Sequence, residues 1–310
     1  MMNDLQQVRQ LLRSQNFIRD SIMVIQFNKK TGSRGIEWTD RTHNRTGGCH
    51  HGCVWTMPDG TRVECYAKVL AENGVAKSAY PNGFEHHYWR QKNAGAMQRL
   101  KTPSLIFIDS MSDLFAQEVP VEHVGIVLEE VKQAPQHIGQ VLTKNAPRIL
   151  KFQDQLPVNL WIGVSSPPDE MRGIRLSRAV QEKMLRVQLR VLEKIQADRP
   201  DLITWMSIEP LSWDISKVLS ESCPLKWAVI GAATNGRKAY QPADIHVSSV
   251  LDVLDRNEVP VFFKGNLEWP EWREDYPLLN HPALLRRQQM AKEHGWTLNR
   301  VLLTRRTVGG

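Results

Sequence analysis

Short apolar runs alternate with helical stretches between about residue 100 and residue 264, and this alternation limits the possible folds. Successive residues in the runs are apolar, as in strands buried on both faces. The runs lie at residues 104–109, 138–143, 159–165, 202–209, 227–231 and 259–264. The intervening segments, such as 121–133 and 179–196, have helical periodicity. With an earlier strand around 35–38, about seven parallel strands joined by crossover helices predict an α/β fold, a partial or complete TIM-like (β/α) barrel.

Polar residues follow these predicted strands at their carboxyl ends. They include Asp109, Ser112, Asp113, Lys144, Ser165, Ser207, Glu209 and Lys264. In a β/α barrel, these strand ends share one rim, where catalytic groups lie. A single residue of this kind is better explained as a turn residue or a helix cap, so the prediction of a functional rim depends on the whole set.

Three of the four cysteines, Cys49, Cys53 and Cys65, lie in one short stretch, far from Cys223. Three clustered thiolates can hold an iron–sulfur cluster and leave one iron without a protein ligand, open to a substrate or cofactor. Eleven residues separate Cys53 from Cys65. This segment must fold back to bring the two thiols together, and the Met-Pro-Asp-Gly sequence at 57–60 predicts the necessary turn.

Two other interpretations of the cysteines remain open. A zinc ion could be held by the same thiolates, with His43, His50 or His51 completing four ligands. Against zinc, the stretch lacks the paired C-x2-C spacing of common structural sites. Alternatively, the cysteines could be buried side chains without a ligand.

Basic residues recur at helical spacing between residues 171 and 199. The formal net charge is +7, from 40 Lys and Arg against 33 Asp and Glu. The stripe comprises Arg175, Arg178, Arg186, Arg190 and Lys194. Such a stripe could follow a phosphate backbone, although most charge runs are simply solvated helix faces.

The composition favours a water-soluble protein in a reducing compartment. With 41% hydrophobic residues, the 310-residue chain can bury a sizeable core. No apolar run approaches the roughly 20 residues that span a bilayer, and the first residues lack the pattern of a secretory signal. Four cysteines in this length do not form a disulfide framework, so we expect a cytoplasmic location.

The chain resembles a bacteriophage-type family of unknown function with a three-cysteine motif, whose members are similar to radical SAM enzymes. The matching stretches lie in family order at residues 36–40, 48–53, 65–67, 109–115, 141–144, 161–165, 207–211 and 259–264. The Ser-Met-Ser-Asp-Leu-Phe and Ser-Ile-Glu-Pro-Leu blocks are the most specific of these. The chain departs from the family pattern in three places. These are the long gap between Cys53 and Cys65, residues 43–45, where His-Asn-Arg replaces the usual Trp-Asn-Pro, and residues 231–236, where the family usually has Gly-Gly-Glu-Ser-Gly.

The resemblance implies a barrel of the radical SAM type in which Cys49, Cys53 and Cys65 hold a [4Fe–4S] cluster. S-adenosylmethionine (SAM) would bind the open iron and be cleaved to methionine and a 5′-deoxyadenosyl radical, which abstracts hydrogen from the substrate. We expect the polar groups of SAM to contact Ser165, Ser207 and Glu209. Candidate substrate contacts are Asp109, Ser112, Asp113, Lys144 and Lys264, with the two lysines suited to an anion.

We therefore predict a basic N-terminal extension at 1–34, a radical SAM-like barrel at 35–268 and a C-terminal loop and helix extension at 269–310. The expected partners are an electron-donor protein and a nucleotide or nucleic-acid substrate. A second hypothesis is a zinc-containing nucleic-acid-binding protein without catalysis. A third is a barrel that kept the fold but lost the reaction, suggested by the altered segment 231–236.

Overall fold

The computed structural model describes residues 36–293, apart from positions 58, 75, 90–93, 237 and 278. The predicted basic extension at 1–34 lies outside the described residues, as does the part of the predicted C-terminal extension after residue 293.

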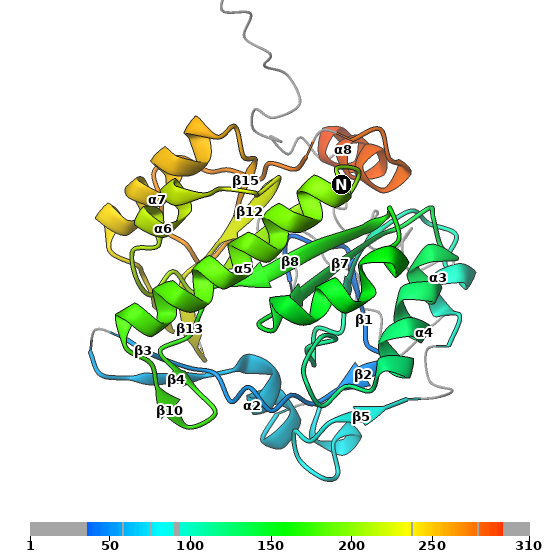
Figure 1. Cartoon of the computed structure of the whole chain (residues 1–310), viewed down its shortest axis with the longest axis horizontal. Coiled ribbons are helices and arrows are strands. Elements are labelled where there is room, and N and C mark those ends of the chain that lie inside the picture. Colours follow the sequence, from blue (N-terminus) through cyan, green and yellow to red (C-terminus); the bar gives the residue numbers. More distant parts are fainter. Residues whose placement is uncertain are drawn as a thin grey trace, which may run out of the picture.

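One seven-stranded parallel sheet forms the centre of the molecule (Figure 1). Its order follows the chain: β1 (Arg41–His43), β6 (Leu105–Ile108), β7 (Ile138–Thr143), β8 (Leu160–Ser165), β11 (Thr204–Ile208), β12 (Trp227–Ile230) and β15 (Val261–Phe263). Neighbouring strands are all parallel. Within the described chain β15 does not pair with β1, so the sheet is an open half-barrel. The predicted α/β barrel is thus confirmed in its partial form.

The first strand was expected too early in the sequence. Residues 37–38 form a turn, and the strand is Arg41–His43 instead. Trp38 fills the inner face of the sheet with its side chain rather than pairing through its backbone, while the polar side chains of β1 are buried. The prediction placed the strand at Trp38 because an apolar residue indicates burial. Trp38 is indeed buried, but it is not part of a strand.

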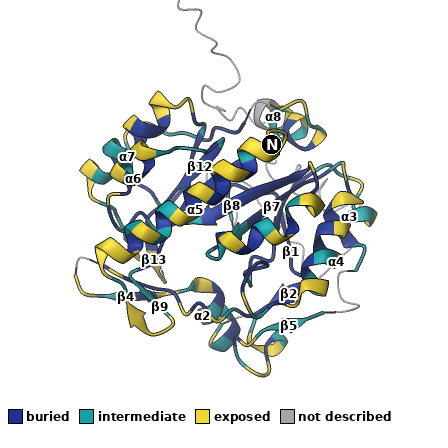
Figure 2. Cartoon of the chain, viewed as in Figure 1, coloured by how far each residue is buried: buried dark blue, intermediate teal, exposed yellow. Residues whose placement is uncertain are grey.

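Helices cover the outer face of the sheet, and the main apolar core lies between these helices and the strands. The helices are α4 (Val121–Lys132), η3 (Ala146–Gln155), α5 (Arg178–Asp198), α6 (Ser216–Glu221) and α7 (Asp244–Arg256). Figure 2 shows α5 buried along the side that meets the sheet and exposed along the other. None of the helices in the described part of the chain is both long and apolar enough to cross a bilayer.

A second apolar cluster covers the inner face of the half-barrel and is built largely of tryptophans. Ring centroids lie 5.0 Å apart for Trp38 and Trp205, and 4.9 Å apart for Trp205 and Trp227. Gly163 makes room for this layer, because a Cβ atom there would lie 2.5 Å from the Trp205 ring. The inner face is therefore lined mainly by packed aromatic side chains, and it also carries the buried Gln140 of β7, the register partner of Trp161.

Smaller elements surround the carboxyl ends of the strands. A four-stranded antiparallel sheet joins β3 (Val54–Thr56), β4 (Arg62–Glu64), β9 (Glu170–Met171) and β10 (Ile174–Arg175) in the order β10-β9-β3-β4. Two further pairs are β2 (Thr46–Gly47) with β5 (His87–Tyr88), and β13 (Ala233–Asn235) with β14 (Lys238–Tyr240). The remaining helices are α2 (Tyr66–Glu72), η2 (Lys77–Ala79), α3 (Ala96–Arg99) and α8 (Pro282–Glu293).

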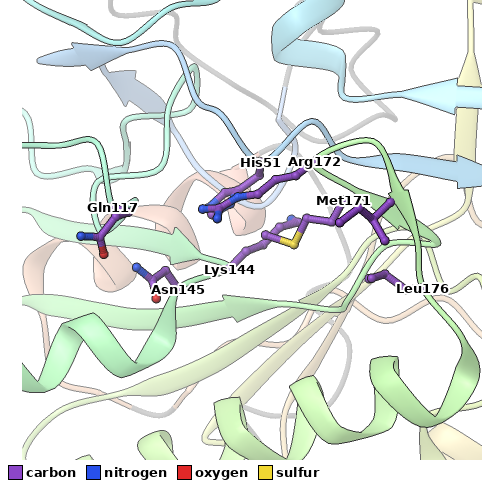
Figure 3. A pocket seen from close by; sticks show the side chains of 8 residues that line it. His51, Gln117, Lys144, Asn145, Met171, Arg172 and Leu176 are labelled. Carbon is purple, nitrogen blue, oxygen red and sulfur yellow. The ribbon is translucent and has the colours of Figure 1, made fainter.

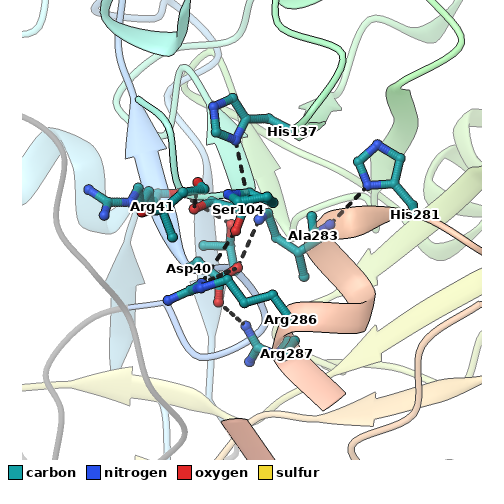
Figure 4. A network of polar contacts seen from close by, with 12 residues as sticks. Asp40, Arg41, Ser104, His137, His281, Ala283, Arg286 and Arg287 are labelled. Atoms are coloured by element: carbon teal, nitrogen blue, oxygen red, sulfur yellow. Dashed lines mark hydrogen bonds and ion pairs between the residues drawn. The ribbon is translucent and has the colours of Figure 1, made fainter. Parts of the chain in front are cut away.

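The C-terminal part of the described chain packs against both the edge and the inner face of the sheet. Asp275 donates its N–H to the Val261 carbonyl at 3.0 Å, which extends the β15 edge. Arg287 of α8 donates to Asp40 and to the Glu37 carbonyl, both at 2.7 Å (Figure 4). Residues near the start of β1 are thereby tied to the last described helix.

Candidate functional site

The β3–β4 hairpin brings Cys53 and Cys65 together. Val54 is paired with Glu64, and the Cys65 N–H donates to the Cys53 carbonyl at 3.1 Å. The two cysteines are therefore opposite each other at the open end of the hairpin, where side chains of facing residues are neighbours. The eleven intervening residues form the arms and the turn, which confirms the predicted reversal near residues 57–60.

Cys49 is held by backbone bonds to two other loops. Its N–H donates to the Phe84 carbonyl at 3.1 Å. The preceding residue, Gly48, donates to the Met111 carbonyl at 3.0 Å and accepts from the Ser112 hydroxyl at 2.8 Å. We expected Ser112 at the substrate. Instead it anchors residues 48–53, the cysteine loop, to the loop that follows β6.

The three thiols interact electrostatically. Burial raises the pKa of Cys49, and Asp113, Cys53 and Cys65 raise it further. Burial likewise raises the pKa of Cys53 to about 11, against an opposing effect of Lys144. Without a bound cation, the thiols of Cys49 and Cys53 stay protonated at neutral pH, so a metal centre would have to displace their protons.

His51 and Asp113 form a buried pair beneath the cysteine loop. The His51 Nε2 and the Asp113 Oδ2 lie 2.8 Å apart. Asp113 also accepts backbone N–H bonds from Lys144 at 2.9 Å and Phe115 at 3.0 Å. Burial raises the pKa of Asp113, but the bonds from His51 and its other donors outweigh that effect and lower it. Asp113 thus ties the cysteine loop to the end of β7.

Asp109 likewise holds the backbone in place. It accepts from the N–H groups of Arg45 and Thr46 at 2.8 and 2.9 Å, and from the Thr46 hydroxyl at 2.8 Å. Burial raises its pKa to about 6, while these bonds oppose the shift. Of the predicted substrate contacts, Asp109 and Asp113 therefore use their carboxylates within the protein.

The residues expected to contact SAM lie side by side at the strand ends. Ser165 and Ser207 are register partners on β8 and β11. Glu209 Oε2 accepts from the Ser207 hydroxyl at 3.0 Å and from the Trp38 indole at 3.3 Å. Its other oxygen is 3.2 Å from the Lys264 ammonium. Glu209 and Lys264 thus form an ion pair above the tryptophan layer.

Tyr66 connects this ion pair with the cysteines, a link that the sequence analysis missed. Its hydroxyl donates to the Ser110 carbonyl. Although Tyr66 as a residue is 51% exposed, desolvation around its hydroxyl raises its pKa, and the charges of Cys65 and Glu209 raise it further. The available signal was its position directly after the third cysteine.

Two of the three departures from the family pattern, the long cysteine hairpin and the segment after β12, lie against each other. Ala233, in the altered segment after β12, packs in one apolar cluster with Cys53 and Trp55 of the cysteine hairpin. Lys238 of β14 donates to Asp59, at the tip of the hairpin, at 2.9 Å. The altered segment thus supports the long hairpin.

The histidines near the cysteines pair with carboxylates. His43 Nε2 is 3.2 Å from Glu130, and His50 Nε2 is 2.7 Å from Glu85. Among the residues that the structure describes, no group of three or more His, Cys, Asp or Glu side chains is arranged to hold one metal ion. Among these residues, therefore, neither the ligand set expected for zinc nor the set of three cysteines is arranged as a site for a single ion.

Arg175 of the predicted basic stripe lies in β10 and not on the helix, and most of the other members, on α5, are neutralised or stacked. Arg186 bonds to Glu221 at 2.7 and 2.8 Å and to Glu182 at 3.2 Å. Lys194 pairs with Asp198 at 2.9 Å, and Arg178 lies over the Trp213 ring. These contacts favour a solvated helix face over a phosphate track.

Comparison with known proteins identifies the family but no activity. No curated protein matches the chain. Similar solved structures include a cysteine-to-serine variant of spore photoproduct lyase, 8% identical with a TM-score of 0.47, covering 75% of this chain and 81% of that one. Another is spore photoproduct lyase complexed with dinucleoside spore photoproduct, 8% identical with a TM-score of 0.42, covering 75% and 66%. These similarities are too distant to assign a reaction. A family model described as a protein of unknown function (DUF5131) matches residues 33–304, and the chain belongs to this family.

Proposed function

We propose that this protein is a radical SAM-like enzyme in which Cys49, Cys53 and Cys65 hold a [4Fe–4S] cluster. The observation that carries the proposal is the pairing of Cys53 with Cys65 by the hairpin, with Cys49 coupled electrostatically to both. When bound, such a cluster supplies the electron for reductive cleavage of SAM.

The donor set suits a cluster better than a single ion. A zinc ion needs four ligand atoms about 2.0–2.3 Å from one point, and the described residues contain no such group. The ligands of a cluster are shared among several irons, so three thiolates need not converge on one position. Apolar side chains, including Trp55 and Val63, pack against Cys53, and a hydrophobic shell of this kind limits the access of water to a metal centre.

The protein's own groups would bind and orient SAM beside the cysteines. Glu209 offers a carboxylate for an ammonium group, and Ser165 and Ser207 offer hydroxyls. Lys264 offers a cation for a carboxylate. The tryptophan layer below excludes water from the inner face. We expect a nucleotide or nucleic acid as substrate and an electron-donor protein as partner, in a reducing cytoplasm.

The test of the cluster is anaerobic purification followed by reconstitution with iron and sulfide. We expect about four irons and four sulfides per chain and an electron paramagnetic resonance (EPR) signal after reduction. Cys49→Ser, Cys53→Ser and Cys65→Ser should each lose iron. Cys223→Ser is the matched control, because Cys223 packs against the main core instead. A colourless protein after reconstitution, or stoichiometric zinc in its place, would contradict the proposal.

The test of the SAM site uses the reconstituted protein. SAM should change the EPR spectrum, and dithionite should lead to release of 5′-deoxyadenosine. Glu209→Gln should weaken the spectral response to SAM without lowering the iron content, because Glu209 is not one of the proposed cluster ligands. An unchanged response in this variant would remove Glu209 from the proposed SAM site.

A further inference from the structure

A cleft of about 380 Å³ lies beside the cysteine loop and has a different character from the SAM region (Figure 3). One wall is His51, from the loop that carries Cys49 and Cys53. The segments after β6, β7 and β8 contribute Gln117, Lys144, Asn145, Met171 and Arg172. No acidic side chain is among the described residues that line it. Its volume falls within the range of small-molecule sites.

Two cations, Lys144 and Arg172, give the cleft its positive character. Lys144 lies over the Trp55 ring, 5.7 Å from its centroid. Neither Lys144 nor Arg172 has an ion-pair partner in the described part of the chain, in contrast to Arg186 on α5. The Nδ1 atom of the buried His51 has no hydrogen-bond partner there either, because only Nε2 contacts Asp113.

Arg172 occupies a backbone position that disfavours arginine. Arg172 and Gly173 form the two-residue turn between β9 and β10, with φ values of 54° and 73°. Turns of this type favour Asn and Gly, because a Cβ atom is strained at positive φ. The turn itself needs only the Arg172 N–H, which donates to the His51 carbonyl at 2.7 Å. The fold therefore does not require the guanidinium, and a function for that side chain explains its presence.

We propose that this cleft binds a phosphate group of the substrate, with Lys144 and Arg172 providing the positive charge. A guanidinium and an ammonium together suit a phosphate, which carries several acceptor oxygens. Lys144 lies over Trp55, which packs in one cluster with Cys53, so a bound phosphate would lie next to the cysteine site. The inference deepens the proposed function by naming the recognised group, but phosphate binding itself does not require a cluster.

The test measures phosphate binding to the full chain, with and without reconstituted iron. The probes are a fluorescein-labelled oligothymidylate of about 12 nucleotides, followed by anisotropy, and thymidine 5′-monophosphate as competitor. Lys144→Ala and Arg172→Gly should each weaken binding about tenfold and reduce the slope of log K against log salt by about one. The matched control is Arg190→Ala, an exposed cation on α5, which should change neither quantity.

Arg172→Gly separates charge from folding, because glycine relieves the positive φ and should leave the melting temperature equal or higher. Competition by the mononucleotide supports a nucleotide ligand, whereas binding of the oligonucleotide alone supports a strand backbone. Binding of neither probe overturns the proposal, as does wild-type affinity in both cleft variants. Iron content is measured separately, so loss of the cluster with intact phosphate binding would count against the enzyme proposal alone.

Discussion

Gly48 shows how a single residue sets the course of the cysteine loop. Its φ is 79°, and a Cβ atom at this position would lie 2.0 Å from the Glu85 carbonyl oxygen. Gly48 thus lies between the loop that contains Glu85 and the loop that contains Met111. It donates its N–H to the Met111 carbonyl at 3.0 Å. Glycine is therefore required here both for its conformation and for the space that it leaves.

Gly48→Ala should lower the free energy of unfolding by about 2–5 kcal/mol, because the strain of positive φ adds to a backbone clash. Gly60→Ala is the matched control. Gly60 also has positive φ, at 80°, but a Cβ atom there meets nothing within 4 Å, so we expect a loss of about 1–2 kcal/mol. Urea unfolding followed by circular dichroism measures both values. Equal losses would show that the contact with Glu85 does not constrain the loop.

At the scale of elements, the β3–β4 hairpin fixes the relation between Cys53 and Cys65. Side chains alternate between the faces of a strand, so a shift of one residue in register turns a side chain to the opposite face. The arms must therefore keep Val54 opposite Glu64 for the thiols to remain neighbours. The turn carries no such constraint on the cysteines.

A glycine inserted between Glu64 and Cys65 should abolish iron binding after reconstitution, because it moves the third thiol out of register. A glycine inserted between Asp59 and Gly60 adds the same residue at the turn, where loop length has a small energetic cost, and should retain iron. Iron and sulfide analysis gives the comparison, and circular dichroism confirms that both variants fold. Iron retained in the first variant would show that this register does not position the ligands.

The sequence predicted the strands of the half-barrel well because their burial on both faces leaves continuous apolar runs, as in β8 and β12. It did not predict β1, because the residues of β1 are polar. They can be buried since residues distant in the sequence provide them with hydrogen-bond and ion-pair partners. His43, for example, pairs with Glu130. The same limit applied to the rim: placement at a strand end could not distinguish Asp109, which holds backbone N–H groups, from Glu209, which remains beside Lys264.

At the scale of the whole molecule, the C-terminal segment helps to close an open sheet. Tyr276 stacks on Trp227 with centroids 5.3 Å apart and donates to the Trp38 carbonyl at 3.1 Å. Arg287 lies over the Tyr276 ring, 5.0 Å from its centroid, and donates to Asp40 at 2.7 Å. The inner tryptophan layer is therefore covered by residues that the sequence placed in a C-terminal extension, and we propose that this segment folds together with the barrel.

Arg287→Ala tests this coupling, because it removes the guanidinium that joins α8 to the start of β1. Asp40 keeps the Leu105 N–H at 2.8 Å but loses its closest cation, since Arg286 is 3.9 Å away. We expect unfolding to become easier by about 2–4 kcal/mol, as when one partner of a buried ion pair is removed. Arg287→Lys should recover only part of this loss, because an ammonium lacks the planar fork that reaches both acceptors.

Gln289→Ala is the control on the same helix, because Gln289 is exposed and, within residues 36–293, its side chain bonds to Glu293 of the same helix at 2.8 Å and to nothing outside α8. Its effect should stay within about 0.5 kcal/mol. Fluorescence and circular dichroism should report one transition in every variant, since the tryptophan layer and the helices unfold together if α8 belongs to the barrel. A separate early transition in wild-type protein, or equal midpoints for Arg287→Ala and Gln289→Ala, would mean that the half-barrel is stable without this closure.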